Sequence, residues 1–228
     1  YLIATRPEEE QNLASCAELV RAANSNGGSN LLTELISKLP YDHPARMYYK
    51  SIEIAPEKTY GSILSTLQSK LGKFDSKEIA ELTSTDTIDF EEIGNKKTAV
   101  YVISSDTHTA YDFLLTIFFS QMIQQLYDYA DQNGGKLKEQ TFFILDEFAN
   151  IGKIPDFDKK ISTSRSRKIS FSVILQNIDQ LEAVYEKSHE TIIGNCDTTI
   201  FLGSNSQKTV EYFSKELGEK TIAHESWS

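Results

Sequence analysis

The hydrophobic and polar positions follow two different patterns, and the change falls near residue 88. In the first part apolar residues recur at helical spacing, as at Ile63, Leu64, Leu67 and Leu71, which fall on one face of a helix. Helices are predicted over residues 13–23, 31–39, 44–55, 59–71 and 75–83. No strand is predicted before about residue 98, so residues 1–87 are expected to form an all-α domain.

The second part alternates between strands and helices. Short, apolar, β-branched runs at 98–104, 141–146, 170–176 and 198–202 are typical of strands that are buried on both faces. Helical patterns at 109–131, 155–168 and 177–189 separate these runs, and a last one covers 209–217. Such alternation predicts βαβ units and a parallel sheet. Residues 88–228 are therefore expected to form an α/β domain.

Composition and charge restrict the class of protein. Hydrophobic residues make up 39% and charged residues 25% of the 228, which excludes a disordered tail, a fibrous repeat and a collagen-like chain. The 23 basic and 33 acidic residues give a net charge of −10. A chain this acidic is not expected to bind nucleic acid over its whole surface. Any contact with DNA or phosphate must use a local basic patch.

Cysteine use and hydropathy add little chemistry. Cys16 and Cys196 lie far apart in sequence without metal-ligand spacing, and we interpret them as reduced structural thiols. The most apolar stretch, 110–126, is interrupted by an aspartate and three glutamines, so no membrane span is predicted. The acidic first 15 residues do not resemble a signal peptide. The chain opens with Tyr1 rather than Met, which is compatible with a piece of a longer protein.

The strongest chemical signal is the pair Asp146-Glu147. Four apolar residues, 142–145, lead into these carboxylates at the carboxyl end of a predicted parallel strand, where open α/β sheets bind ligands. An Asp there can hold Mg²⁺ through water, and the next Glu can orient an attacking water. This is the Walker B arrangement of P-loop ATPases of the ASCE class. The alternative is a buried strand that ends in a solvated acidic pair, and the pattern alone does not decide.

Two further features accompany this pair. Gln176 ends the following strand, where a polar residue of a RecA-like sheet can sense the γ-phosphate; the alternative is an ordinary turn residue. The stretch 159–168 carries five basic residues and no acid. An arginine from it could stabilise phosphoryl-transfer charge across a subunit boundary, or the stretch could contact a DNA backbone. The third alternative is a solvated helix face.

A Walker A loop is not found in the sequence. That loop needs G-x-x-x-x-G-K-[ST], and the Gly-Lys pairs that begin at Gly72, Gly135 and Gly152 lack both the preceding glycine and the following hydroxyl residue. The four histidines are scattered and show no metal spacing, and no nucleophile elbow is present. The sequence therefore predicts half of an ATP site, or none.

The region 143–157 resembles the Walker B region of type IV secretion coupling proteins, the DNA-transfer ATPases of bacterial conjugation, and most of all their Gram-positive branch. The resemblance covers nearly the whole chain, and it continues through residues 164–170, 174–176, 191–203, 39–44 and 60–64. The block Leu145–Asn150 is its most specific part, while the helical region is less specific.

The resemblance implies a fold and an assembly. Such proteins have a transmembrane anchor and a RecA-like P-loop ATPase domain with a parallel sheet, into which an all-α domain is inserted. They form homo-hexamers at the cytoplasmic face of the plasma membrane. There they bind the relaxase–DNA complex and pass it to the type IV secretion channel, with ATP and Mg²⁺ as cofactors. The all-α domain, here 1–87, is implied to recognise the substrate. DNA is a possible direct partner, and the sequence leaves open whether the chain contacts it.

The resemblance also implies roles for single residues. Asp146 matches the acid that holds Mg²⁺ through water and so contributes to cofactor binding. Glu147 matches the acid that activates water, Gln176 the sensor, and Arg165 the arginine finger that acts on the ATP of a neighbouring subunit.

The chain departs from the family pattern in ways that set the expectation for its activity. The anchor and Walker A of the family lie upstream and are not found here, so we expect a soluble internal fragment that is inactive alone, from a parent that is an ATPase. The alternative function is a non-catalytic module of a secretion system that docks a partner and uses no nucleotide. The sequence upstream of Tyr1 would discriminate between the two.

Overall fold

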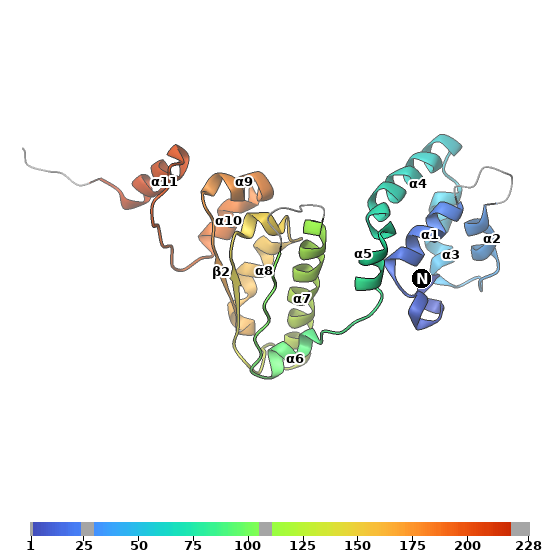
Figure 1. The fold of residues 1–228 in the computed structure, drawn as a ribbon, viewed down its shortest axis with the longest axis horizontal. Helices are drawn as coiled ribbons and strands as arrows, with labels where there is room; N and C mark the ends of the chain where they lie inside the picture. The colour runs from blue at the N-terminus through green and yellow to red at the C-terminus, as the bar shows by residue number, and fades with distance from the viewer. Residues whose placement is uncertain (1, 24–29, 105–110, 220–228) are drawn as a thin grey trace, which may run out of the picture. The chain divides into compact units, whose positions relative to one another are not determined.

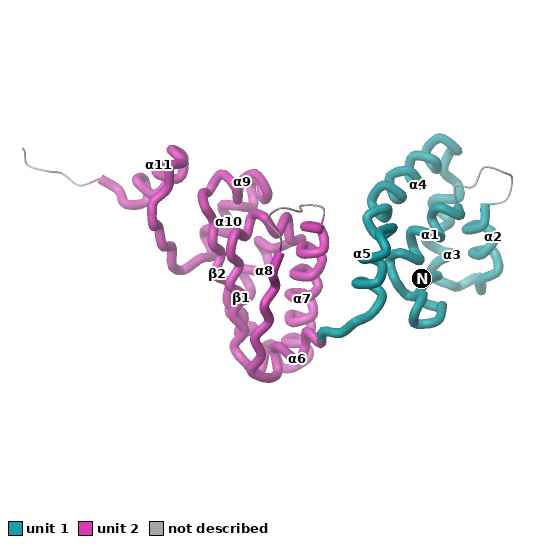
Figure 2. Tube along the Cα trace, viewed as in Figure 1, with its two compact units in different colours: residues 1–88 teal, residues 89–228 magenta. Residues whose placement is uncertain are grey.

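The computed structural model describes residues 2–23, 30–104 and 111–219. Its contacts divide the chain into two compact units, Tyr1–Ile88 and Asp89–Ser228, drawn in different colours in Figure 2. Each unit is described by itself below.

Unit 1 is a set of short helices (Figure 1). They are η1 (Ile3–Thr5), η2 (Glu8–Glu10), α1 (Leu13–Ala23), α2 (Leu31–Ser37), α3 (Pro44–Glu53), α4 (Glu57–Leu71), η3 (Gly72–Asp75) and α5 (Lys77–Leu82). Local sequence explains where they begin: Asn30 accepts hydrogen bonds from the first turn of α2, and His43 with Pro44 starts α3. A small core of Val20, Ala23 and Leu64 joins α1 to α4.

A hydrogen-bonded tyrosine pair ties three helices of unit 1 together. The Tyr49 hydroxyl on α3 lies 2.6 Å from the Thr33 hydroxyl on α2 and 3.4 Å from the Tyr60 hydroxyl on α4. Burial raises the pKa of Tyr49 to about 12, so this phenol stays protonated and can donate. Unit 1 is therefore stabilised by buried polar contacts as well as by its small apolar core.

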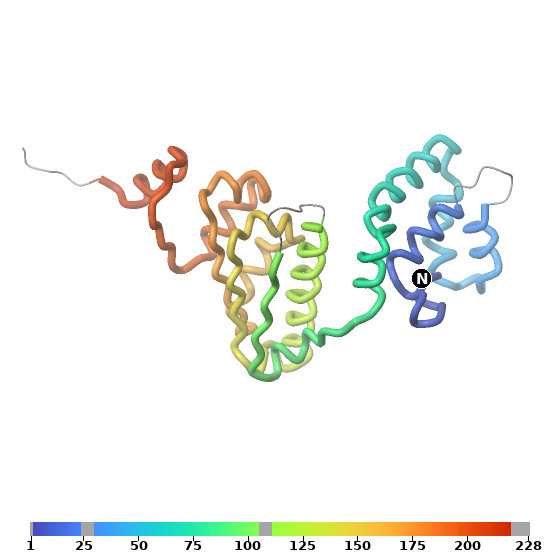
Figure 3. The backbone as a smooth tube through the Cα atoms, viewed as in Figure 1, coloured from blue at the N-terminus to red at the C-terminus, as the bar shows by residue number. Residues whose placement is uncertain are grey.

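Unit 2 is mixed α/β. Its elements are α6 (Phe90–Asn95), α7 (Asp112–Gln132), β1 (Thr141–Leu145), η5 (Phe148–Ile151), α8 (Phe157–Thr163), η6 (Arg165–Arg167), β2 (Ile169–Val173), α9 (Ile178–Tyr185), α10 (Ser188–Gly194) and α11 (Gln207–Leu217). β1 and β2 pair in parallel, from Thr141 opposite Ile169 to Leu145 opposite Val173. The trace in Figure 3 follows the crossover between them through α8.

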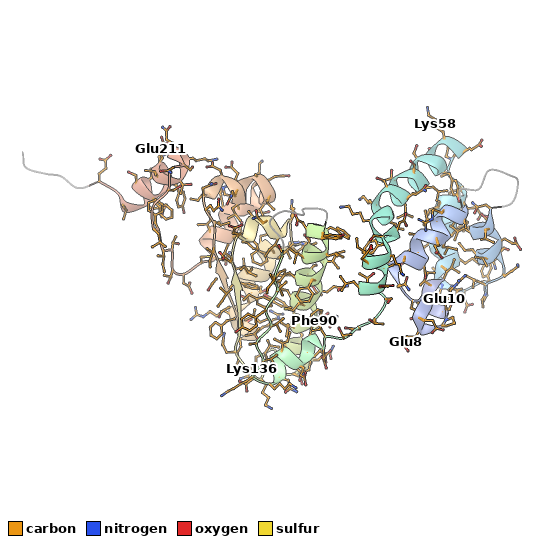
Figure 4. All side chains as sticks on the ribbon, viewed as in Figure 1. Glu8, Glu10, Lys58, Phe90, Lys136 and Glu211 are labelled. Atoms are coloured by element: carbon orange, nitrogen blue, oxygen red, sulfur yellow. The ribbon has the colours of Figure 1, made fainter. Side chains whose placement is uncertain are left out.

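The core of unit 2 lies on one face of this pair of strands. Phe143 of β1 stacks on Phe171 of β2 with ring centroids 5.0 Å apart, and Leu126 of α7 belongs to the same core with no exposed surface. Phe90 of α6, labelled in Figure 4, packs edge to face against Phe118 of α7 at 5.3 Å. The core therefore holds α6 and α7 against the sheet.

The parallel α/β arrangement is confirmed, and two paired strands are compatible with part of a P-loop ATPase sheet. The helical predictions on both sides of residue 88 are confirmed within a few residues, except that the helix expected over 155–168 ends at Thr163. Two helices, α6 and α10, have no counterpart among the predictions. No helix among the described residues is both long and apolar enough to cross a membrane.

Two of the four expected strands are wrong. Residues 98–104 and 198–202 take no regular secondary structure, although their sequences favour strands. A strand needs a neighbour that completes its ladder of hydrogen bonds, and in the described ranges only β1 and β2 provide one to each other. The apolar side chains that predicted burial are instead open to solvent: Ile103 is 93% and Leu202 is 95% exposed.

Gly152 follows η5 in a conformation that other residues avoid, with φ 85° and ψ −175°. A Cβ atom at this position would lie 2.7 Å from the Thr116 hydroxyl oxygen of α7, and that hydroxyl donates to the carbonyl of Ile151. The chain can therefore pass close to α7 here only because residue 152 has no side chain.

We expect Gly152→Ala to lower the free energy of unfolding of unit 2 by about 2 kcal/mol or more, from backbone strain and overpacking. Gly61→Ala is the matched control, because Gly61 lies inside α4 with no atom within 4 Å of an added Cβ. That change should stabilise unit 1 by about 0.5–1 kcal/mol. Urea denaturation followed by circular dichroism measures both, and equal effects of the two changes would contradict this account.

Candidate functional site

The chain turns sharply after β1, and this turn carries Asp146 and Glu147. Glu147 adopts the left-handed conformation, with φ 48° and ψ 47°. The next residue, Phe148, has no exposed surface, and its N–H donates to the carbonyl of Ile174 at 3.1 Å. The N–H of Ile174 in turn donates to the carbonyl of Leu145 at 3.0 Å. The turn is therefore fixed to the chain that continues from β2.

Aromatic side chains pack against the residue that follows Glu147 in the same turn. Phe148 stacks on Tyr185 of α9 at 5.4 Å and contacts Phe157 of α8 at 4.7 Å between ring centroids. Burial raises the pKa of Tyr185 to about 12, so its hydroxyl stays protonated. That hydroxyl accepts a hydrogen bond from the N–H of Ile154 at 3.1 Å. The segment after Glu147 is thus held to both neighbouring helices.

Three of the four predicted site residues come together here. Glu147 Oε1 accepts a hydrogen bond from Gln176 Nε2 at 3.1 Å, and Asp146 Oδ1 accepts one from the Glu147 N–H at 3.1 Å. Gln176 Oε1 lies 3.5 Å from Gln180 Nε2 on α9, at the limit of hydrogen-bond distance. Because β1 and β2 are parallel, the residues that follow their carboxyl ends meet at one edge of the sheet.

Asp146 and Glu147 are exposed, and neither forms an ion pair within the part of the chain that the structure describes. Among the same residues no group of three His, Cys, Asp or Glu side chains is placed to hold a metal ion. An all-protein metal cage therefore does not fit. One uncompensated carboxylate does fit the Mg²⁺ of a metal–phosphate complex, which needs only one or two carboxylates besides phosphate and water.

Within the basic stretch 159–168 some side chains form ion pairs or hydrogen bonds, and Arg165 differs from them. Arg167 donates from Nε and Nη2 to the Asp131 carboxylate at 3.0 and 3.1 Å, and its guanidinium lies 4.8 Å from the ring centroid of Tyr127. Lys159 pairs with Asp156 at 2.7 Å, and partial burial lowers the pKa of Lys160. Arg165 is exposed, and within the described ranges its guanidinium forms no hydrogen bond or ion pair, although its backbone carbonyl accepts a hydrogen bond from the Lys168 N–H at 3.1 Å.

Arg165 lies at the opposite end of β2 from the other three predicted site residues. It precedes Ile169, the first residue of β2, whereas Gln176 follows Val173, the last. The four steps from Ile169 to Val173, at about 3.3 Å each, place roughly 13 Å between the two ends of the strand. The structure therefore does not bring Arg165 to the Glu147 of its own chain.

Asn150 joins the site without having been predicted as a member. Its Nδ2 atom donates to Glu147 Oε2 at 2.6 Å, and its backbone N–H donates to the Glu147 carbonyl at 2.8 Å. The sequence contains one signal of this contact: an asparagine three residues after the glutamate can reach back within one turn and hydrogen-bond to it. The left-handed backbone of Glu147 gives no such signal in the sequence.

The fold and site together define a mixed α/β protein with an acidic pair at the carboxyl end of a parallel strand. The family described as Type IV secretory system Conjugative DNA transfer matches residues 1–228. This chain belongs to that family.

Individual relatives agree with this assignment. Protein VirD4 of Rhizobium rhizogenes is 26% identical over 148 residues, which cover 64% of this chain and 22% of the relative. Conjugal transfer protein TraG of Escherichia coli is 26% identical over 180 residues, or 75% of this chain and 28% of the relative. Coupling protein TraD of Escherichia coli K12 is 26% identical over 118 residues, or 51% and 16%. The matched part of the chain thus spans between 16% and 28% of the length of these relatives.

The two arginines of η6 should differ in their effect on stability. We expect Arg167→Ala to lower the free energy of unfolding of unit 2 by about 1–2 kcal/mol, since it removes a bidentate ion pair and a contact with an aromatic ring. Arg165→Ala should change it by less than about 0.5 kcal/mol, as for an exposed side chain without partners. Urea denaturation of the two variants decides, and a larger loss for Arg165→Ala would contradict the geometry described above.

Proposed function

We propose that the full-length protein couples ATP hydrolysis to the transfer of a relaxase–DNA substrate into a type IV secretion channel. Membership of the conjugative DNA transfer family supports this proposal. The observation that carries the chemistry is the Glu147 carboxylate, held beside Asp146 and Gln176 at the carboxyl end of two parallel strands. Ligands of open α/β sheets bind at such an edge.

The roles of the side chains follow from their chemistry. Asp146 is proposed to hold Mg²⁺ through water, and ATP supplies the phosphoryl group that water attacks. Glu147 accepts the proton of that water and orients it, as the corresponding acid does in phosphoryl transfer. Gln176 contacts Glu147, and this contact supports a role for Gln176 as the sensor of the γ-phosphate. A Walker A loop is not found in this sequence, and the phosphate cradle must therefore come from elsewhere.

Arg165 is proposed to act on the site of a neighbouring subunit. It is exposed, its side chain has no hydrogen bond or ion pair within the described ranges, and it lies at the far end of β2 from its own Glu147. An arginine finger supplied in trans fits this position, because a ring of identical subunits can bring one subunit's Arg165 to the next subunit's carboxylates. We propose a homo-hexamer at the cytoplasmic face of the membrane as this ring.

Unit 1 is proposed to be the inserted all-α domain that recruits the substrate complex. Its helix α3 and the adjoining turns expose large apolar side chains: Tyr41 is 84%, Met47 69% and Ile54 78% exposed. Scattered apolar residues are normal on a surface, but several on one short segment favour contact with another protein. The same observation favours the second candidate function, a docking module that uses no nucleotide, and the hydrolysis measurements below discriminate between the two.

In the full-length protein we expect Glu147→Gln to leave ATP binding intact and to reduce turnover at least 100-fold, because Glu147 acts on the attacking water and not on the ground-state phosphates. Asp146→Ala should weaken binding of Mg–ATP as well. Isothermal titration and steady-state phosphate release separate these effects. Normal turnover by Glu147→Gln would remove the assigned role and favour the docking module.

Arg165→Lys in the full-length protein should bind ATP normally and hydrolyse it at least 100-fold more slowly, because Lys keeps the charge but loses the planar fork. Mixing this variant with Glu147→Gln should restore part of the activity, since some subunit boundaries would then pair an intact Arg165 with an intact Glu147. Phosphate release without DNA measures all three samples. Full activity of Arg165→Lys would instead favour a role for Arg165 in binding DNA phosphates.

A further inference from the structure

The backbone at Glu147 is strained, and the strain is held in place by its surroundings. A left-handed conformation is unfavourable for a residue with a side chain, because its Cβ atom then crowds the following carbonyl oxygen. Here the cost is offset by the burial of Phe148 and by the hydrogen bond from its N–H to Ile174. The turn therefore fixes the position of the Glu147 Cα and Cβ atoms. The side-chain torsion angles of Glu147 are then determined by the contacts of its carboxylate.

Two amide groups set these torsion angles. Asn150 Nδ2 donates to Oε2 at 2.6 Å, and Gln176 Nε2 donates to Oε1 at 3.1 Å. One donor comes from η5 and the other from the chain after β2, so they approach the carboxylate from separate elements. A carboxylate whose two oxygens are each held by a donor has its plane and its direction fixed.

The arrangement leaves the carboxylate able to work as a base. A carboxylate offers about four lone-pair positions, two on each oxygen. Each Glu147 oxygen accepts one amide hydrogen bond, so one position on each remains for a water molecule. The two amides are neutral and are not basic enough to accept a proton from water at ordinary pH, so they orient Glu147 without replacing it as the base.

Asn150 contributes little else to the fold. Its side chain is exposed, it belongs to no buried cluster, and its amide donates to Glu147. An aspartate in its place would have nearly the same shape but no N–H to donate, and it would put a second negative charge against Glu147. A substitution at this position therefore tests the hydrogen bond with little disturbance of the packing.

We propose that Asn150 is a positioning residue that holds the Glu147 carboxylate in the direction required for it to activate water. This inference rests on the proposed function, because Asn150 can affect hydrolysis in this way only if Glu147 activates the attacking water. It predicts that loss of the Asn150 amide slows the chemical step while the affinity for nucleotide and the stability of the protein remain.

The test uses the full-length protein and two variants. Asn150→Asp should lower kcat for ATP hydrolysis at least tenfold, since small misplacements of a reacting group cost one to two powers of ten. Asn150→Ala, which removes the donor without adding charge, should lower kcat less than Asn150→Asp does. For both, KM, the ATP affinity from isothermal titration and the melting temperature should stay at the values of the unmodified protein.

Asn133→Asp is the matched control. Asn133 is also exposed and also donates from Nδ2 to a local acceptor, the Tyr129 carbonyl at 2.8 Å, but it lies at the end of α7. This variant makes the same chemical change outside the site, so its kcat should stay within twofold of the unmodified protein. A kcat of Asn150→Asp within twofold as well would overturn the proposal.

A double-mutant cycle separates this inference from the proposed function. In a Glu147→Gln background Asn150→Asp should cause no further loss in single-turnover hydrolysis, because the group that it positions is already gone. An equal loss in both backgrounds, or a loss that follows the melting temperature, would show a structural role and overturn the proposal. If Glu147→Gln alone kept full turnover, the proposed function would fail first, whatever Asn150 does.

Discussion

The parallel pairing of β1 with β2 is the constraint on which the candidate site depends. The hydrogen bond from the Ile174 N–H to the Leu145 carbonyl and the one from the Phe148 N–H to the Ile174 carbonyl extend this pairing past the strand ends. They bring Gln176 to the turn that carries Glu147, although the two residues are 29 positions apart in sequence. Without this pairing Glu147 would lose its contact with Gln176, and only the local contact from Asn150 would remain.

The sequence predicts those parts of this arrangement that local pattern determines. The apolar run before Asp146 identifies β1, and the position of Gln176 after the next run places it at the same sheet edge. The two amide hydrogen bonds to the Glu147 carboxylate could not be predicted, because they depend on a left-handed backbone that a glutamate rarely adopts. Likewise, the distinction between Arg165 and Arg167 depends on Asp131, which is 36 positions away from Arg167.

The two strands that the sequence predicts and the structure lacks have a physical explanation. A β-branched, apolar run favours a strand that is buried between two neighbouring strands, but whether such strands are present depends on the rest of the chain. The same holds for β1, whose residues Phe142 and Ile144 are 68% and 73% exposed while the alternate residues are buried. These sequences thus have the hydrophobicity of a sheet covered on both faces, and the described part of the chain covers one face.

The positions of the charged groups have a consequence for the unit of activity. Arg165 and Glu147 lie at opposite ends of β2, and the strand between them is a rigid spacer whose alternate side chains, Ile169, Phe171 and Val173, pack in the core. A rearrangement that brought both to one phosphate within a single chain would have to break the pairing with β1 and the aromatic packing around Phe148. Association of two chains requires neither change. If both residues serve one reaction, as proposed, the smallest competent unit is therefore a pair of neighbouring subunits.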